Sequence, residues 1–287
     1  MTGQASMETI TQPIESNAQP LFHSRVIAIT SGKGGVGKTN VVGGIALSLA
    51  KAGHRVVVLD ADFGLANLDI LFGLSPKYTL QNVLRGERVI EEIIVEGPYG
   101  MRLIPASNGI QQLTKLDSVD ELRLIQGLQR VSIGTEWLLI DTAAGIHESV
   151  TKLLMAAQEV ILVSTPEPTS LVDAYAMIKL IHVRDKRKPI WLLINNAQNQ
   201  EEAQDSIEDI RDAAMTFLGK SINSLGMVPS DSHILQAVRQ QQGVVELFPD
   251  SPASAAFQAI TETLADKAPN DIKKDGIDAF WKGLRRG

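Results

Sequence analysis

A glycine-rich segment near the start of the chain has the residue types and spacing of a phosphate-binding loop. Residues 32–39 fit the pattern G-x-x-x-x-G-K-[ST] without a gap. Glycines allow such a loop to fold round an anion, so that backbone N–H groups and a helix N-terminus point at phosphate oxygens. Lys38 would interact with the β- and γ-phosphates, and the Thr39 hydroxyl would bind Mg²⁺. The predicted nucleotide contacts are Gly32, Lys33, Gly34, Gly35, Val36, Gly37, Lys38 and Thr39.

Three aspartates follow apolar runs, at the positions where a parallel sheet places its ligands. Residues 55–62 form a predicted buried strand with Asp60 and Asp62 at its carboxyl end. Asp60 would help to hold the magnesium shell, and Asp62 would orient or deprotonate the water that attacks a γ-phosphate. A second apolar run, 137–140, ends in Asp141, which would bind Mg²⁺ through water. Each aspartate alone is also typical of a turn cap, but a phosphate loop upstream favours the magnesium role.

The elements that must position these side chains alternate between strand and helix. An apolar run at 26–29 precedes the phosphate loop and a helical pattern ending at Gly53 follows it, which disfavours a chance glycine-rich turn. Further strands are predicted near 101–106, 159–165, 190–196 and 225–229, with helical stretches near 79–84, 113–131, 170–183 and 254–266. This alternation predicts an α/β fold with a doubly wound, mainly parallel sheet in a single domain over residues 24–268.

Composition limits the kinds of protein that this chain can be. The 287 residues are 44% hydrophobic and 21% charged, which is ordinary for a globular chain with a sizeable core. The net charge of −6 argues against a surface built mainly for nucleic acid, and no sequence-specific DNA binding is expected. Cysteine is absent, so disulfides and thiolate metal sites are excluded. No apolar run is long enough to span a bilayer and no secretory signal is present, which predicts a cytoplasmic protein.

The two ends of the chain differ from the body. Residues 1–23 are polar and lack periodicity, so they are predicted to form a flexible arm. In residues 269–287, an apolar stripe at i, i+3, i+4 and i+7 is surrounded by lysines and arginines; the stripe comprises Ile277, Phe280, Trp281 and Leu284. A basic amphipathic segment of this kind either contacts a membrane surface weakly or docks on its own domain. The sequence leaves both alternatives open.

The phosphate loop, with its second lysine at Lys33, resembles the deviant Walker A loop of the MinD/ParA family of ATPases. By itself Lys33 is equally consistent with a solvated surface charge. The resemblance implies a P-loop NTPase fold, with ATP and Mg²⁺ as ligands and a dimer that encloses the nucleotide. It further implies that Lys33 reaches the phosphates of the partner chain, so that hydrolysis depends on dimerisation.

The segment from Asp60 to Asp69 resembles switch I of the same family. The resemblance implies that Asp62 is the catalytic carboxylate and Asp60 a supporting one, which makes Lys33, Lys38 and Asp62 the expected catalytic residues. It also implies that Asn195 reads the adenine edge and that Pro229 and Asp231 line the base pocket. Turn residues at strand ends are an equally good description of these last three.

Segments near 141–145, 156–160 and 166–176 are similar to the FleN/FlhG branch of this family, MinD-like ATPases that restrict flagellar number. The resemblance implies a slow ATPase switch that antagonises the flagellar master transcription activator, with a link to the flagellar GTPase FlhF. It places the protein in the cytoplasm, with a peripheral position at the cell membrane or pole as a further expectation. The alternatives are a positioning ATPase for DNA partition or division-site placement, and a metabolic P-loop enzyme.

Overall fold

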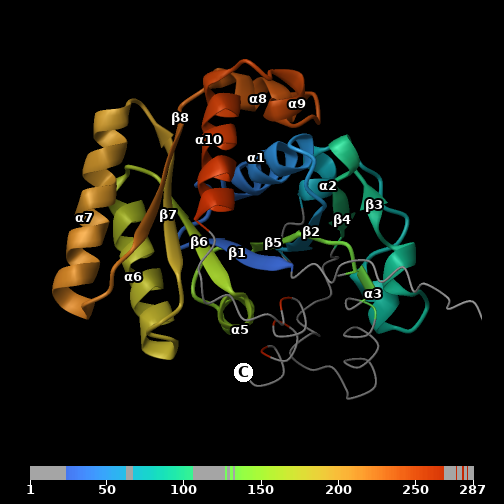
Figure 1. The fold of residues 1–287 in the computed structure, drawn as a ribbon, viewed down its shortest axis with the longest axis horizontal. Coiled ribbons are helices and arrows are strands. Elements are labelled where there is room, and N and C mark those ends of the chain that lie inside the picture. Colours follow the sequence, from blue (N-terminus) through green and yellow to red (C-terminus); the bar gives the residue numbers. More distant parts are fainter. Residues whose placement is uncertain are drawn as a thin grey trace, which may run out of the picture.

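A computed structural model of the chain describes residues 24–62, 67–105, 127, 130–131, 133–267, 276, 280 and 283. The predicted N-terminal arm and most of the predicted helix near 113–131 lie outside these residues. The described part is built on one eight-stranded sheet in the order β3-β4-β2-β5-β1-β6-β7-β8 (Figure 1). Seven neighbouring strands run parallel, whereas the edge strand β3 pairs antiparallel with β4. The mainly parallel α/β sheet expected from the sequence is confirmed.

The strands lie where the apolar runs predicted them, within one or two residues. Their bounds are β1 Arg25–Ser31, β2 Val56–Ala61, β3 Val95–Glu96, β4 Arg102–Ile104, β5 Trp137–Thr142, β6 Glu159–Ser164, β7 Ile190–Ala197 and β8 Asn223–Pro229. The short strand β3 was not expected. It has only two residues, too few to show the period-two pattern that identifies a strand in a sequence.

Helices cover both faces of the sheet (Figure 1). Their bounds are α1 Lys38–Lys51, α2 Leu68–Leu71, α3 Leu80–Leu84, α5 Glu148–Ala156, α6 Pro168–Arg184, α7 Gln200–Leu218, α8 Ser232–Arg239, α9 Val244–Leu247 and α10 Pro252–Asp266, with the 3₁₀ segments η1 Ile90–Glu92 and η2 Pro98–Gly100. Helices α1 and α10 belong to the apolar cluster on one face, and α5, α6 and α7 to the cluster on the other.

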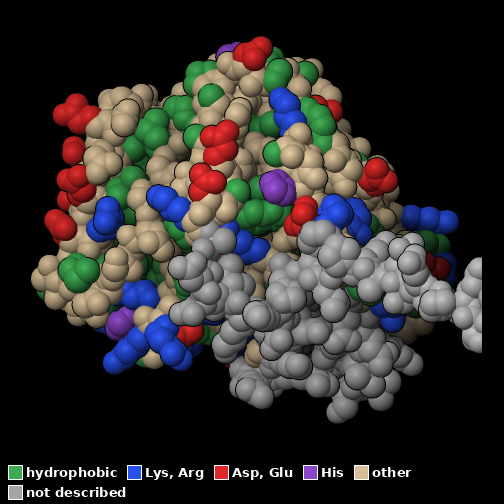
Figure 2. Space-filling view, in the orientation of Figure 1, with side chains coloured by type: hydrophobic (Ala, Val, Ile, Leu, Met, Phe, Trp, Pro, Cys, Tyr) green, Lys and Arg blue, Asp and Glu red, His purple; other side chains and the backbone are tan. Residues whose placement is uncertain are grey.

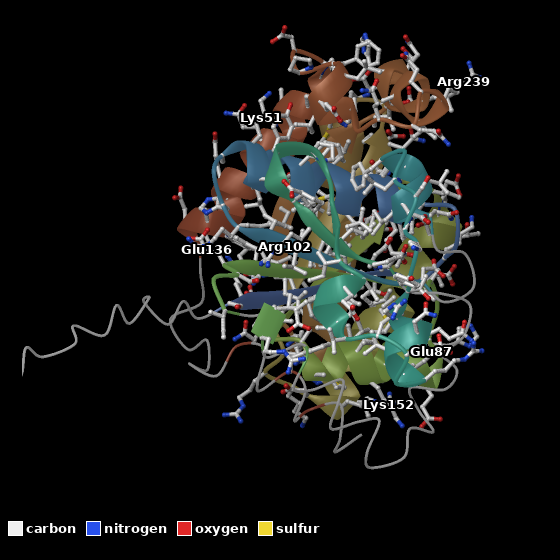
Figure 3. The ribbon with its side chains drawn as sticks, turned by 90° about the vertical axis from the view of Figure 1, so that its right-hand side faces the viewer. Lys51, Glu87, Arg102, Glu136, Lys152 and Arg239 are labelled. Atoms are coloured by element: carbon white, nitrogen blue, oxygen red, sulfur yellow. The ribbon has the colours of Figure 1, made fainter. Side chains whose placement is uncertain are left out.

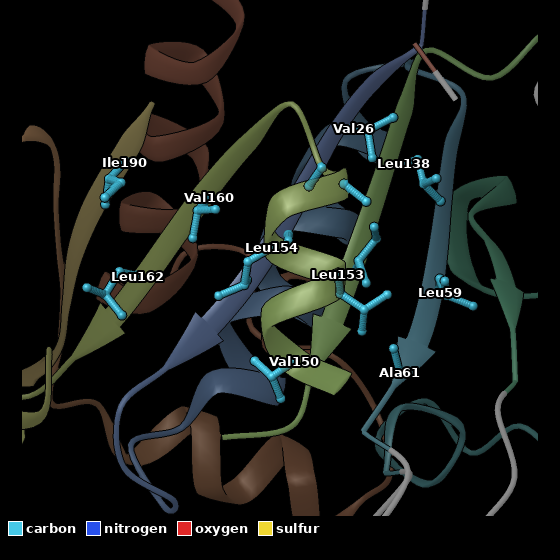
Figure 4. Packing of buried hydrophobic residues seen from close by; sticks show 14 of the residues in the cluster. Val26, Leu59, Ala61, Leu138, Val150, Leu153, Leu154, Val160, Leu162 and Ile190 are labelled. Carbon is cyan, nitrogen blue, oxygen red and sulfur yellow. The ribbon is translucent and has the colours of Figure 1, made fainter. Parts of the chain in front are cut away.

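Alternate residues of a strand belong to different apolar clusters, because successive side chains of a strand point to opposite faces of the sheet. In β1, Val26 and Ala28 join the cluster with α5, α6 and α7, while Ile27 and Ile29 join the one with α1 and α10. Figure 4 shows the first cluster, in which Leu153 and Leu154 of α5 lie over strand residues such as Val160 and Leu59. Burial on both faces explains why the central strands read as continuous apolar runs.

The structure also bears on the predictions for the C-terminal stripe and for membrane spans. Phe280 is fully buried in the cluster formed with α5, α6 and α7, so this residue of the predicted C-terminal stripe packs against the domain. The other three members of the stripe lie outside the described residues. None of the described helices combines the length and the apolar character that a membrane span requires.

Candidate nucleotide site

The glycine-rich loop connects the carboxyl end of β1 to the N-terminus of α1, in the central part of the sheet. Gly37, the residue before α1, has a left-handed backbone with φ 83°. A Cβ at this position would lie 2.4 Å from the Asn195 side-chain nitrogen, so glycine is required by both the conformation and the space. The first turn of α1 carries no acidic residue, which leaves its backbone N–H groups suited to an anion.

Lys38 sits at the centre of the candidate site. Its ammonium group, almost completely buried, donates to the Asp141 carboxylate and lies 3.8 Å from Asp62 Oδ2. Asp141 ends the apolar run of β5 and Asp62 follows β2, so two neighbouring parallel strands deliver these carboxylates to the same edge of the sheet. The structure therefore brings together Lys38, Asp62 and Asp141, which the sequence separates by up to 103 residues.

Asp60 and Asp141 are paired in register on β2 and β5, and both are buried. Burial, and then the charge of Asp141, raises the pKa of Asp60 from 3.8 to about 7. Burial likewise raises the pKa of Asp141, although the charge of Lys38 opposes this shift. The Asp60 carboxylate also accepts the backbone N–H groups of Asp62 and Leu68, at 3.2 and 3.3 Å. Asp60 thus holds the start of the segment that carries Asp62.

The charges of this site fit a magnesium nucleotide. Two adjacent buried carboxylates favour a divalent cation, which would offset the repulsion between them. Within the described residues, no cluster of three or more His, Asp or Glu side chains forms a complete metal site. A Mg²⁺ ion held here by Thr39, Asp60 and Asp141, directly or through water, would take its other ligands from phosphate oxygens and water. This is the arrangement of P-loop sites, in which protein supplies only part of the coordination shell.

Lys33 points away from this centre and is held by its own chain. Its Nζ lies 2.9 Å from Glu167 Oε2 and 3.1 Å from Thr169 Oγ1, at the start of α6. The Ser31 hydroxyl donates to the Lys33 carbonyl oxygen at 2.9 Å and supports the turn. Sequence reasoning missed Glu167 and Thr169 as partners, because no local pattern links residues that are more than 130 positions apart.

The segment after β5 is hydrogen-bonded to the carboxyl end of β1, just before the phosphate loop. The Gly145 N–H donates to the Ser31 carbonyl oxygen at 2.9 Å, and the Thr142 hydroxyl donates to the Ile29 carbonyl oxygen at 3.1 Å. Gly145 has φ 89°, a left-handed conformation that glycine adopts without strain. These bonds place the residues that follow Asp141 beside the start of the phosphate loop.

The three predicted base-pocket residues have other contacts in the structure. Asn195 Nδ2 donates to the Val36 carbonyl oxygen at 2.8 Å, so this side chain supports the phosphate loop. Asp231 caps α8 by accepting the His233 N–H, and its second oxygen accepts the Ala253 N–H, each at 2.9 Å. These bonds, and the His233 ring, hold the pKa of Asp231 below its usual value despite partial burial. Adenine contact by Asn195, Asp231 and Pro229, the last residue of β8, stays a prediction.

Comparison with known proteins finds relatives that match most of this chain. The family described as AAA domain matches residues 24–192. The antiactivator FleN of Pseudomonas aeruginosa is 42% identical, over 83% of this chain and 85% of that protein. The flagellum site-determining protein YlxH of Helicobacter pylori is 33% identical, over 91% and 90% of the two chains.

A solved structure shows the same fold. The MinC:MinD cell division protein complex of Aquifex aeolicus contains a chain that matches with a TM-score of 0.71 at 28% identity. The match covers 85% of this chain and 97% of the other. The similarity in fold therefore extends over most of both chains.

Proposed function

This chain belongs to the MinD/ParA family of P-loop ATPases, and from that premise we propose that it works as an ATP-dependent dimeric switch. Binding of ATP with Mg²⁺ at residues 32–39 would hold two chains together, and hydrolysis would let them separate. The observation that carries this proposal is the convergence of Lys38, Asp62 and Asp141 beside the phosphate loop. A buried lysine that is paired with carboxylates can bind a phosphate oxygen instead when a nucleotide enters the site.

Hydrolysis needs a positioned water molecule and a stabilised leaving group. Asp62, half-buried next to Lys38, would accept the proton of the water whose oxygen attacks the γ-phosphorus, and ADP would leave with the bridging oxygen. Lys38 would stabilise the charge that develops on the β- and γ-phosphates. Bound Mg²⁺ would neutralise part of the same charge. Lys33 would leave Glu167 and contact the phosphates of the partner chain, which makes turnover depend on the dimer.

The proposed output is regulation of the number and placement of flagella. Similarity to an antiactivator and to a flagellum site-determining protein supports this assignment. The ATP-bound dimer would antagonise the flagellar master transcription activator, and it would be linked functionally to the flagellar GTPase FlhF. A slow ATPase suits this task, because the lifetime of the bound state then sets the duration of the signal.

Peripheral membrane contact through the C-terminal segment belongs to the same proposal. Because Phe280 is buried against the domain, it would have to leave its position before the apolar stripe could enter a membrane surface. Dimerisation would strengthen a weak contact of this kind, since two segments act together. The expected location is therefore the cytoplasm, with a fraction at the membrane or pole in the ATP-bound state.

The proposal is tested by capture of partners with the Asp62→Ala variant loaded with ATP. This variant should retain nucleotide and remain dimeric, and the expected captured protein is the flagellar transcription activator. Lys38→Ala, which should not bind ATP, is the matched control and should capture none. Specific recovery of division-site or DNA-partition proteins by the Asp62→Ala variant would overturn the flagellar assignment and leave the switch intact.

A role in DNA partition would require a surface that binds DNA. Such an ATPase needs a positive face whose DNA affinity falls steeply with salt. Figure 2 shows acidic side chains along the exposed side of α7, at the left of the view, and α7 itself contains Glu201, Glu202, Asp205, Glu208, Asp209 and Asp212. The exposed side of α7 is therefore unsuited to nucleic acid.

A further inference from the structure

A cavity lies at the opposite end of α1 from the phosphate loop. It has a volume of about 350 Å³ and is formed where the C-terminus of α1, the η2 segment, β4 and the turn before β5 meet. Its lining residues are Ala50, Gly53, His54, Arg55, Tyr99, Gly100, Arg102, Ile133 and Gly134. Since α1 has 14 residues, the cavity is about 20 Å from the phosphate loop. The two sites are therefore separate.

Among the residues that line this cavity, Arg102 has the surroundings that most favour a bound anion. Its guanidinium group donates to the Thr135 hydroxyl oxygen at 2.7 Å, and the Thr135 hydroxyl in turn donates to the Val131 carbonyl oxygen at 2.6 Å. No carboxylate among the described residues forms an ion pair with it. Partial burial, and then repulsion by Arg55, lowers the pKa of Arg102. A half-buried cation of this kind is costly unless an anion accompanies it.

A second guanidinium group, that of Arg55, is anchored at the same cavity. Arg55 Nη2 lies 3.5 Å from Glu136 Oε1, and the backbone N–H of Arg55 donates to Glu136 Oε2 at 2.8 Å. His54 Nδ1 lies 3.5 Å from the same carboxylate. Figure 3 shows Arg102 and Glu136 at about the same height in the view, with Lys51, the last residue of α1, above them. Glu136 thus holds Arg55 at the cavity wall, where Arg102 also lies.

The backbone of the cavity wall is also unusual. Tyr99 has φ 57°, a left-handed conformation that is unfavourable for a non-glycine residue. The residue is partly exposed at the cavity, so its aromatic ring offers an apolar surface beside the cationic groups.

We propose that this cavity binds a small phosphate monoester, with Arg102 and Arg55 on the phosphate and Tyr99 beside the organic group. Guanidinium groups match phosphate oxygens in charge and in the fork geometry of their N–H donors. A phosphate anion would offset the half-buried charge of Arg102, and the volume suits a ligand of this size. The site is independent of the nucleotide site and does not depend on the proposed flagellar function.

Phenyl phosphate is a direct probe of this proposal. The full-length protein is first saturated with ADP and Mg²⁺ to fill the phosphate loop, and phenyl phosphate is then titrated by calorimetry. The expected result is saturable binding of one molecule per chain. Arg102→Gln should weaken it by about tenfold or more, as expected for loss of a charged hydrogen bond. Arg85→Gln, which removes an exposed arginine elsewhere, should not change it.

Three further measurements complete the test. Arg102→Gln should bind ADP as the wild-type protein does, which shows that it is folded. If it does not fold, Ile133→Trp decides instead, because Ile133 is 66% exposed at the cavity and a larger side chain should block the cavity without disturbing the core. Benzoate should bind more weakly than phenyl phosphate. Equal binding of benzoate, equal affinity in the folded cavity variants, or no saturable heat in the wild type would each overturn the proposal.

Discussion

Lys33 Nζ lies 2.9 Å from Glu167 Oε2 of the same chain, so in this structure the second lysine of the phosphate loop is paired internally. Both groups are well exposed, with 41% of the Lys33 and 66% of the Glu167 side chain accessible to solvent. Such a pair contributes about 0.5 kcal/mol or less. Lys33 can therefore leave Glu167 at little cost when another anion is offered to it.

The first prediction concerns Lys33. Lys33→Ala should bind ATP about as well as the wild type, because Lys38 remains, but it should neither dimerise nor hydrolyse ATP. Light scattering after size-exclusion chromatography in ATP and Mg²⁺ measures the dimer, and phosphate release measures turnover. Glu167→Gln is the informative partner variant, since freeing Lys33 should change dimer affinity by no more than about twofold. A dimeric Lys33→Ala protein would contradict the role in trans.

The second prediction concerns Lys38, the buried partner of Asp141. Lys38→Ala should abolish ATP binding and should also lower the stability of the nucleotide-free protein by about 3 kcal/mol, because Asp141 then remains buried without its cation. Calorimetric titration with ATP and chemical denaturation measure the two effects. Lys51→Ala, at the exposed end of the same helix, should change neither. Retention of ATP binding in Lys38→Ala would refute the site.

The third prediction concerns Asp62. Asp62→Ala should bind ATP normally and hydrolyse it about 100-fold more slowly, as expected for loss of a general base. It should therefore accumulate as a dimer in ATP. Single-turnover hydrolysis and light scattering are the measurements, with Asp69→Ala in the neighbouring helix α2 as the matched control. Hydrolysis at the wild-type rate would show that another group positions the water.

The fourth prediction follows from the pKa of Asp60, which rises from 3.8 to about 7 on folding. A raised carboxyl pKa means that the folded chain holds the proton more tightly, so its stability falls as pH rises from about 4 to 7 and is constant above that. The loss is up to about 4 kcal/mol. In the absence of Mg²⁺, Asp60→Asn should therefore melt above the wild type at about pH 8, with a much smaller difference at about pH 5. Equal melting temperatures at both pH values would contradict the shift.

The fifth prediction concerns Phe280, which is fully buried. Phe280→Ala should destabilise the nucleotide-free protein by about 3 kcal/mol, the usual cost of removing a buried aromatic ring. Phe217→Ala is the matched control, because Phe217 on α7 is 73% exposed and its loss should have little effect. Denaturant unfolding of the two variants provides the comparison. Equal stability would mean that the C-terminal segment does not pack on the domain in solution.

The glycine loop and the strands were predictable because their signals are local. Residues 32–37 lie between a buried strand and a helix that begins at Lys38, and the apolar runs ending in Asp60 and Asp141 are the adjacent strands β2 and β5. The edge strand β3 was not predictable, because two residues carry no periodicity. For Asp231 the structure shows the capping contacts that strand-end residues commonly make, which the sequence could not distinguish from a base contact.

By itself, the sequence determined the order of strands and helices, the phosphate loop and the aspartates that follow the strands, since each depends on neighbours a few positions away. Tertiary structure alone decided that Lys38 meets Asp141, that Lys33 rests on Glu167 and that Arg102 shares a cavity with Arg55. These contacts join residues from about 50 to more than 130 positions apart. They exist only because the packed sheet brings distant strand ends and turns together, and no local pattern of residues encodes that meeting.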